Sequence, residues 1–194
     1  MQKDWTISST VIPLSDTNID TDRIIPARFL KSTSRANLSE ALFSDERYSS
    51  NGEKKADFPL NDKKYSGSIL IAGYNFGCGS SREHAVWALV DYGFKAVISS
   101  FFADIFKNNS LNNSLLPIQV SESFLSFCFE KVKNNTNTII SINLTKGIID
   151  CENNTESFYI NPYKKECIIN GYDDIDYLCS LKENIKNFEK NIIF

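Results

Sequence analysis

The chain has 194 residues, 42% of them hydrophobic and 23% charged, a balance typical of a soluble globular protein with one core. Its net charge of −3 argues against a basic surface, so we expect neither a nucleic-acid partner nor a membrane-surface partner. The longest apolar runs are far too short to cross a bilayer and the first residues lack a secretory signal pattern, so we expect a cytoplasmic protein.

The first third of the chain predicts one strand followed by a long irregular segment. Residues 5–14 alternate loosely and predict a strand, whereas residues 15–30 are rich in Asp and Thr and favour turns. Residues 31–66 are polar, and the only regular element expected there is a short helix around Leu38–Phe43. A segment of this length without strong pattern predicts a functional flap. The apolar run at 68–72 then predicts a buried parallel strand.

From residue 81 onward, helices and strands alternate. We expect a helix within 81–93, a strand at 95–102, a helix at 103–114, a strand at 115–120, a helix at 121–134, antiparallel strands within 138–153 and 156–160, and a closing helix within 170–193. Ser121 or Ser123 is expected to cap one helix, and Asp173 or Asp174 another. This order predicts an α/β fold with a parallel-sheet core and a long flap, built as a single domain over residues 1–194.

The stretch GYNFGCGSSREHA, residues 73–85, is the most informative segment of the chain. One interpretation of it is purely structural. Ser80 and Glu83 have the S-x-x-E spacing of a capping box, in which each side chain accepts a hydrogen bond from the other residue's amide. The glycines would then only permit a tight turn between strand and helix.

The same stretch also has the features of an anion site. A helix that starts just after a buried parallel strand presents free amides and a partial positive charge, at the sheet edge where α/β proteins bind ligands. Gly77 and Gly79 would let a ligand approach the backbone, and Arg82, expected at the second helical position, is suited to a carboxylate. This interpretation predicts a site for a di- or tricarboxylic acid, with Ser80 in an electropositive setting.

Histidine and cysteine give no sign of a metal site in this chain. The five cysteines contain no C-x-x-C pair, which disfavours a disulfide framework and a zinc or iron–sulfur site. The single histidine, His84, is expected either to face a ligand or to pack on its helix, and a packing role is favoured for Cys78. No metal ligand is assigned within the chain.

Three segments follow the pattern of one family in order: NIDTDRIIPARFL, NFGCGSSREHAVWALVDYGFKAVISSFFADIFKNNSLNNSLLP and INGYDDIDYL. The chain closely resembles the small subunits of 3-isopropylmalate dehydratase, which are swivel-domain members of the aconitase superfamily. The resemblance implies a swivelling β/β/α domain of the aconitase C-terminal type, which docks on a large subunit that carries an iron–sulfur cluster (4Fe-4S). Such a pair interconverts 2-isopropylmalate and 3-isopropylmalate through 2-isopropylmaleate in leucine biosynthesis, as a hydro-lyase.

The resemblance also implies which residues form the site. Ser80 would be the general base, while Ser81 and Arg82 would hold a substrate carboxylate. Thr21 and Asp22 would belong to a second active-site segment. The other substrate-binding positions would be Gly77, Gly79, Lys31 and Arg35. In this scheme the cluster iron, as a Lewis acid, takes the substrate hydroxyl while Ser80 takes the proton.

The flap departs from the family pattern, and two alternative functions stay open. The segments RANLS (residues 35–39) and DER (residues 45–47) stand where the family usually has glycines and a tryptophan. One alternative is a non-catalytic domain that binds organic acids, and the other is a related hydro-lyase subunit acting on homoaconitate or a dimethylmalate-type acid. Phe29 and Leu30 are expected to supply an apolar patch for the isopropyl group.

Overall fold

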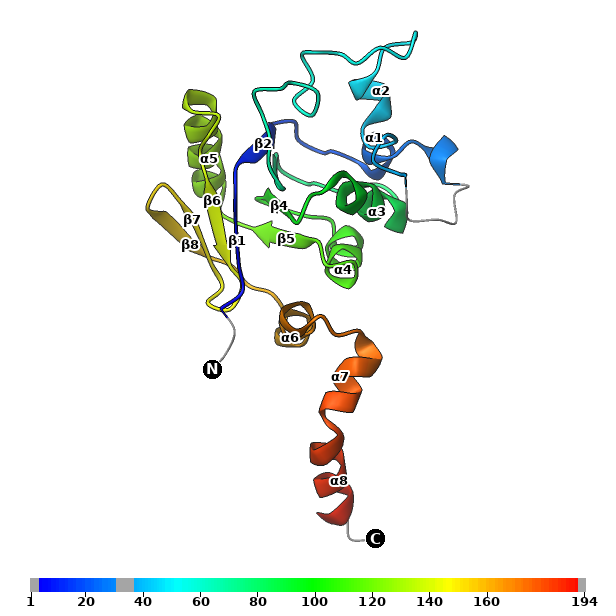
Figure 1. Ribbon diagram of the computed structural model, residues 1–194, viewed down its shortest axis with the longest axis vertical. Helices are drawn as coiled ribbons and strands as arrows, with labels where there is room; N and C mark the ends of the chain where they lie inside the picture. The colour runs from blue at the N-terminus through cyan, green and yellow to red at the C-terminus, as the bar shows by residue number, and fades with distance from the viewer. Residues whose placement is uncertain (1–3, 31–36, 192–194) are drawn as a thin grey trace.

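Two four-stranded sheets form the body of the protein (Figure 1). The chain is described by a computed structural model that covers residues 4–30 and 37–191. The central sheet is parallel in the order β2-β3-β4-β5, and the second is antiparallel in the order β1-β6-β7-β8. The strands are β1 Thr6–Ser9, β2 Val11–Leu14, β3 Ile69–Ala72, β4 Ala96–Ser99, β5 Leu116–Gln119, β6 Ile140–Asn143, β7 Ile148–Cys151 and β8 Asn154–Ser157.

The central sheet is covered on both faces, which explains its apolar sequence. Every residue of β3 and β4 is buried. Because successive side chains of a strand point to opposite faces, Leu70 and Ala72 join one core cluster, whereas Ile69 and Ile71 join the other. The predicted buried parallel strand at 68–72 is confirmed as β3, and the predicted α/β fold with a parallel-sheet core is confirmed with it.

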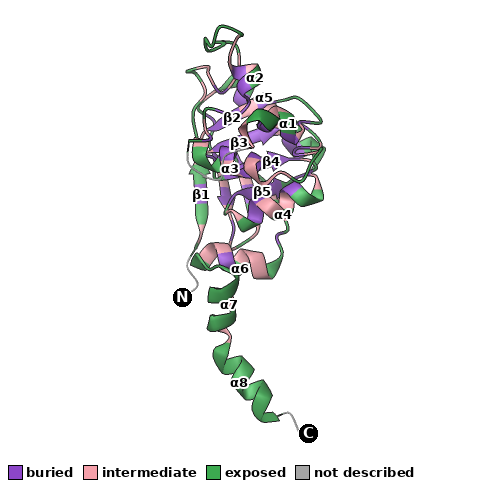
Figure 2. Ribbon diagram, turned by 90° about the vertical axis from the view of Figure 1, so that its right-hand side faces the viewer, coloured by how far each residue is buried: buried purple, intermediate pink, exposed green. Residues whose placement is uncertain are grey.

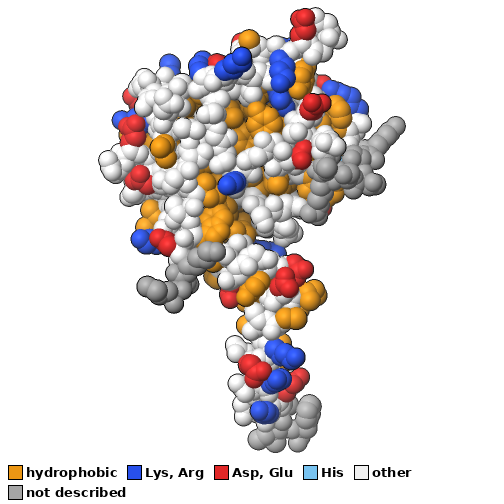
Figure 3. All heavy atoms as spheres, viewed as in Figure 1, with side chains coloured by type: hydrophobic (Ala, Val, Ile, Leu, Met, Phe, Trp, Pro, Cys, Tyr) orange, Lys and Arg blue, Asp and Glu red, His pale blue; other side chains and the backbone are white. Residues whose placement is uncertain are grey.

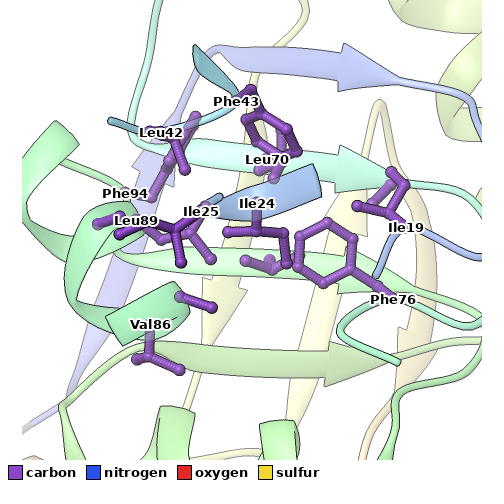
Figure 4. Packing of buried hydrophobic residues seen from close by; sticks show 14 of the residues in the cluster. Ile19, Ile24, Ile25, Leu42, Phe43, Leu70, Phe76, Val86, Leu89 and Phe94 are labelled. Atoms are coloured by element: carbon purple, nitrogen blue, oxygen red, sulfur yellow. The ribbon is translucent and has the colours of Figure 1, made fainter. Parts of the chain in front are cut away.

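Helices cover one face of the central sheet, and the second sheet covers the other together with α5. Figure 4 shows the first cluster, to which three segments contribute Ile24, Phe76 and Val86. The second cluster fills the space between the two sheets and α5, with Cys128 and Cys151 among its buried members. The helices of the body are α1 Thr21–Ile24, a 3-10 helix Ala27–Phe29, α2 Ser44–Arg47, α3 Glu83–Tyr92, α4 Asp104–Asn112 and α5 Glu122–Asn134.

The prediction of a single strand over residues 5–14 is wrong, because the chain changes sheet at Thr10. Before Thr10, β1 pairs antiparallel with β6, and after it β2 pairs parallel with β3. The backbone crosses another segment closely here, since the Thr10 carbonyl oxygen lies 1.9 Å from where a Cβ on Gly67 would be. Loose alternation predicts extended backbone, but it carries no information about a change of pairing partner.

The predicted short helix around Leu38–Phe43 is also wrong. Residues 37–43 form turns, and a single helical turn, α2, begins only at Ser44, after Phe43 in a left-handed conformation with φ of 49°. The cause is the buried Arg47, whose guanidinium donates to the carbonyl oxygens of Ser39 at 2.7 Å and Leu42 at 3.1 Å. Because these two carbonyls accept from a side chain, Arg47 stabilises the turns of residues 37–43.

The middle of the chain follows its predicted order through β4, α4, β5 and α5, and the Ser121 side chain caps α5 as expected. The C-terminal part differs, because two helices, α7 Asp174–Ser180 and α8 Lys182–Asn191, replace the one expected within 170–193, and a helix that was not predicted, α6 Pro162–Asn170, precedes them. Asn161 caps α6, whose first residue is a proline, a start signal present in the sequence. Asp173, one of the two predicted caps, caps α7, and it does so in a capping box with Asp176.

The last two helices, α7 and α8, extend away from the body and form what we term the C-terminal arm, residues 174–191 (Figures 1 and 2). Most of the arm is exposed, in contrast to the buried strands of the body. No helix within residues 4–30 and 37–191 has the length and hydropathy needed to cross a membrane. That the whole chain acts as one domain stays a prediction.

Candidate active site

Two loops at the carboxyl ends of β2 and β3 are held side by side. The amide of Gly77 donates to the carbonyl of Ile19 at 2.8 Å, and the amide of Thr21 donates to the carbonyl of Cys78 at 2.9 Å. Asp20 and Cys78 also form an isolated parallel bridge. The Thr-Asp segment and the glycine-serine segment, which are far apart in sequence, therefore meet at the sheet edge where α/β folds bind ligands.

Gly77 and Gly79 shape this turn in different ways. Gly77 has φ of +75°, and a Cβ there would lie 2.2 Å from Cγ of Phe106, so the turn has no room for a side chain. Gly79 has φ of +92°, but a Cβ there would only reach ordinary contact, 3.4 Å from Oγ1 of Thr21. Gly77 is thus required for packing on α4, whereas Gly79 is an exposed residue beside the buried Thr21.

We expect Gly77→Ala to destabilise the fold by about 2–4 kcal/mol, because a left-handed backbone and a severe clash add together. The matched control is Gly52→Ala, since Gly52 has φ of +82° but nothing lies within 4 Å of its added Cβ. That control isolates the backbone strain and should cost about 1–2 kcal/mol. Urea denaturation of both variants measures the difference, and equal losses would contradict the packing role of Gly77.

Ser80 is exposed, and Thr21 holds it in place. The Ser80 amide donates to Oγ1 of Thr21 at 3.2 Å, and the two hydroxyl oxygens lie 3.2 Å apart. Thr21 itself is only 1% exposed and is the first residue of α1. Because Oγ1 of Thr21 accepts from the amide, its own proton is available to donate to the hydroxyl oxygen of Ser80.

The capping-box interpretation of Ser80 and Glu83 is wrong. Helix α3 begins at Glu83, with Arg82 at the N-cap position and no side-chain hydrogen bond capping it, so Arg82 does not lie at the second helical position. The Ser80 amide is bound by Thr21, and the Glu83 carboxylate accepts instead from the Asn113 side chain at 2.9 Å. The Ser80 hydroxyl is therefore not used in helix capping.

Arg82 forms an ion pair with Asp22 across the two loops. The Arg82 side chain is 20% exposed, whereas that of Asp22 is 58% exposed, so the carboxylate lies on the solvent side of the pair. The side chain of the preceding Asp20 caps α1 by accepting from the amide of Arg23 at 2.8 Å, which fixes the backbone that carries Asp22. An arginine, two serines and the α3 N-terminus thus lie along one edge, where Asp22 pairs with the arginine.

Arg23 was not singled out by sequence reasoning, yet it links the candidate site to the flap. Its guanidinium donates to Oε1 of Glu46 in α2 at 2.7 Å and to Oδ2 of Asp16 at 2.6 Å. The Glu46 carboxylate raises the pKa of Arg23 further above its usual value. The only signal in the sequence was that all five arginines fall within the first 82 residues.

The structure brings seven predicted site residues to the paired loops: Ser80, Ser81, Arg82, Thr21, Asp22, Gly77 and Gly79. Lys31 and Arg35 lie outside the described residues. Phe29 and Leu30 are half-buried and pack against the first core cluster. The largest described cavity, about 830 Å³, does not include Ser80 and lies between the flap and α5. Ser80 and Ser81 instead lie on an open surface.

His84 and Cys78 have packing environments. The His84 ring lies 4.6 Å from the Trp87 ring, one turn further along α3. Burial raises the pKa of the Cys78 thiol, so it is protonated at neutral pH and is a poor nucleophile. Among the described residues, no group of three or more His, Cys, Asp or Glu side chains could hold a metal ion.

The geometry can be compared with known proteins. The family described as aconitase C-terminal domain matches residues 1–123, which include both loops of the candidate site. A crystal structure of 3-isopropylmalate dehydratase (leuD) from Methanocaldococcus jannaschii is similar, with a TM-score of 0.67 and 29% identity over 96% of this chain and 100% of that chain. These matches confirm the expected fold of the aconitase C-terminal type.

Curated relatives match this chain over all or nearly all of its length. The chain is 55% identical over 194 residues to the 3-isopropylmalate dehydratase small subunit of Karelsulcia muelleri, covering 100% of both chains. It is 57% identical over 192 residues to the protein of that name from Christiangramia forsetii, covering 98% and 94% of the two chains. The chain belongs to the aconitase C-terminal domain family and, within it, to the 3-isopropylmalate dehydratase small subunits.

Proposed function

We propose that this chain, with a large subunit, interconverts 2-isopropylmalate and 3-isopropylmalate through 2-isopropylmaleate in leucine biosynthesis. The observation that carries the proposal is the pairing of two loops, which places Ser80 beside Thr21 and Arg82 beside Asp22 on one open edge. The full-length similarity to 3-isopropylmalate dehydratase small subunits supports the same substrate. All five cysteines are free thiols, which fits the reducing cytoplasm as its location.

Arg82 is suited to hold one substrate carboxylate. Its guanidinium is already oriented by Asp22, and the exposed Asp22 side chain can share the guanidinium with the substrate or turn toward solvent. A planar guanidinium then offers parallel donors to the two carboxylate oxygens. Ser81 is exposed beside Arg82 and can donate its hydroxyl to the same carboxylate.

Ser80 is suited to exchange the proton. In dehydration it takes the proton from the substrate carbon next to the one that loses hydroxide, leaving the double bond of 2-isopropylmaleate, and in hydration it returns a proton. The cluster that we assign to the large subunit would, as a Lewis acid, assist the departure of the hydroxide. The reactive form is the alkoxide, which the Thr21 hydroxyl can stabilise by donation and which Arg82 and the α3 N-terminus favour electrostatically. Addition of water with the opposite regiochemistry then gives the isomer.

An iron–sulfur cluster does not fit this chain within the described residues. Three cysteines are buried, Cys78 is half-buried, Cys179 is exposed on the arm, and no three ligand-type side chains converge. We therefore assign the cluster to the large subunit, which the name of the relatives implies as a partner. The open surface around Ser80 and Ser81 fits a site that a second chain completes.

The test is anaerobic reconstitution of this chain alone, of the large subunit alone and of their mixture. We expect visible absorbance from a cluster with the large subunit, and hydration of 2-isopropylmaleate only in the mixture. Turnover or a stable cluster with this chain alone would contradict the division of labour. A mixture with an intact cluster that acts instead on a homoaconitate-type or dimethylmalate-type acid, by hydration or dehydration respectively, would contradict the proposed substrate.

A further inference from the structure

The C-terminal arm carries an apolar stripe that the body does not cover. Ile175, Leu178, Ile185 and Phe188 are between 44% and 69% exposed. Ile175 and Leu178 lie three residues apart in α7, and Ile185 and Phe188 lie three residues apart in α8. The first three of them line a shallow groove of about 490 Å³ along the two helices. Figure 3 shows apolar side chains reaching onto the arm, away from the rest of the molecule. An aligned set of this kind marks an interaction surface.

The base of the arm is anchored, so the stripe has a defined direction. Asp173 and Asp176 form a capping box that starts α7. The Tyr177 ring packs on the ring of Tyr163 in α6 with centroids 4.5 Å apart, and the Tyr163 hydroxyl donates to Asp174. These contacts hold the start of α7 against α6, while Ile175 and Leu178 stay exposed.

The arm adjoins the candidate active site. A cavity of about 480 Å³ is lined at one end by residues 171–174, where the arm begins, and at the other by Glu83, the first residue of α3. Glu83 directly follows Arg82. A large subunit that covers the open edge around Ser80 and extends past Glu83 would reach the cavity that the base of the arm lines.

The extent of the family similarity also favours a large-subunit contact for the arm. The aconitase C-terminal domain match ends at residue 123, whereas the small subunit of Karelsulcia muelleri matches all 194 residues. The arm thus lies outside the shared domain but within the length of the separate small subunits. A domain that is a separate chain lacks the high effective concentration that a covalent linker provides, so additional contact must hold it to its partner.

We propose that the C-terminal arm binds in an apolar groove of the large subunit and holds the two subunits together, an inference that rests on the proposed function. The arm enters such a groove as an amphipathic helix, with its apolar stripe as the anchor. The arm carries charges of both signs: Asp173, Asp174 and Asp176 lie at its base, and Lys182, Glu183, Lys186, Glu189 and Lys190 follow along α8, where Lys186 pairs with Glu183. The apolar stripe, rather than a charge pattern, therefore provides the anchor.

The test measures the affinity of this chain for purified, cluster-loaded large subunit under anaerobic conditions by biolayer interferometry. The variant is Ile185→Ser with Phe188→Ser, and the matched control is Asn184→Ser with Asn187→Ser in the same helix but outside the stripe. Because all four side chains are exposed, neither variant should change the fold, which circular dichroism and thermal melts verify. We expect the stripe variant to bind at least about tenfold more weakly and the control to bind like wild type.

The activity of the same proteins separates this inference from the proposed function. At saturating large subunit, the stripe variant should recover the wild-type kcat, because it still carries Ser80 and Arg82. Unchanged affinity of the stripe variant overturns the inference, including the case where light scattering shows that the stripe instead joins two copies of this chain. If the wild-type subunits bind each other but do not hydrate 2-isopropylmaleate, the proposed function is wrong. The affinities of the stripe variant and its control for the large subunit would still test whether the arm binds there.

Discussion

Ser80→Ala is expected to lower the kcat of the assembled enzyme by roughly 10²–10⁴-fold, the range of a lost general base. The fold should tolerate the change, because the Ser80 hydroxyl is exposed and its one described contact is with Thr21. The backbone contact, from the Ser80 amide to Thr21, survives the substitution. The stability loss should therefore stay below about 1 kcal/mol.

The measurement is kcat and KM of the reconstituted pair, with a thermal melt of the isolated chain. Ser81→Ala is the matched control, because Ser81 is also exposed and lies one residue further along the same loop. If Ser81 binds the carboxylate, its variant should raise KM more than it lowers kcat. Wild-type turnover by Ser80→Ala would remove Ser80 from the chemistry and leave it only a structural contact with Thr21.

Arg82→Lys should impair the complex almost as severely as Arg82→Ala, although it keeps the charge. A guanidinium offers two parallel donors, whereas an ammonium is a point charge on a flexible stem. Asp22 already orients this guanidinium, which indicates that geometry matters here as well as potential. A displacement of the substrate by about 1 Å can cost roughly a hundredfold in rate, and that is the loss we expect for lysine.

Steady-state kinetics of both Arg82 variants in the reconstituted pair checks this prediction, and thermal melts exclude unfolding. Asp22→Asn serves as the companion variant, because it keeps the size of the side chain while weakening the orientation of Arg82. A kcat/KM near wild type for Arg82→Lys would show that positive potential alone holds the substrate. In that case the neighbouring α3 N-terminus would supply the rest of the attraction.

The sequence predicted that Gly77, Gly79 and Ser80 lie together at a sheet edge because these signals are local. Gly77, Gly79 and Ser80 follow a buried strand directly, and their position at a sheet edge depends only on that strand being parallel. The capping box failed because Thr21, 59 residues earlier, binds the Ser80 amide. A local sequence pattern contains no information about a residue of another loop that binds the same amide.

The errors in the fold have the same origin. The chain changes sheet at Thr10 because β1 finds its partner in β6, more than 130 residues away. The expected helix near Leu38–Phe43 is absent because the buried Arg47 binds the carbonyls of that segment. In contrast, α6 was predictable, since Asn161 followed by Pro162 is a helix start that local chemistry alone explains.

The change of sheet at Thr10 also determines the order in which the chain can fold during synthesis. All four strands of the parallel sheet are complete by residue 119, but β1 remains without its partner until residues 140–143 are made. At about 5–20 residues per second, the 137 residues between Thr6 and Asn143 take roughly 7–27 s to synthesise. Throughout that interval an unpaired strand and the apolar face beneath it are exposed to other chains. A product truncated after residue 123 would keep that exposure permanently, so we expect it to aggregate although it contains every loop of the candidate site.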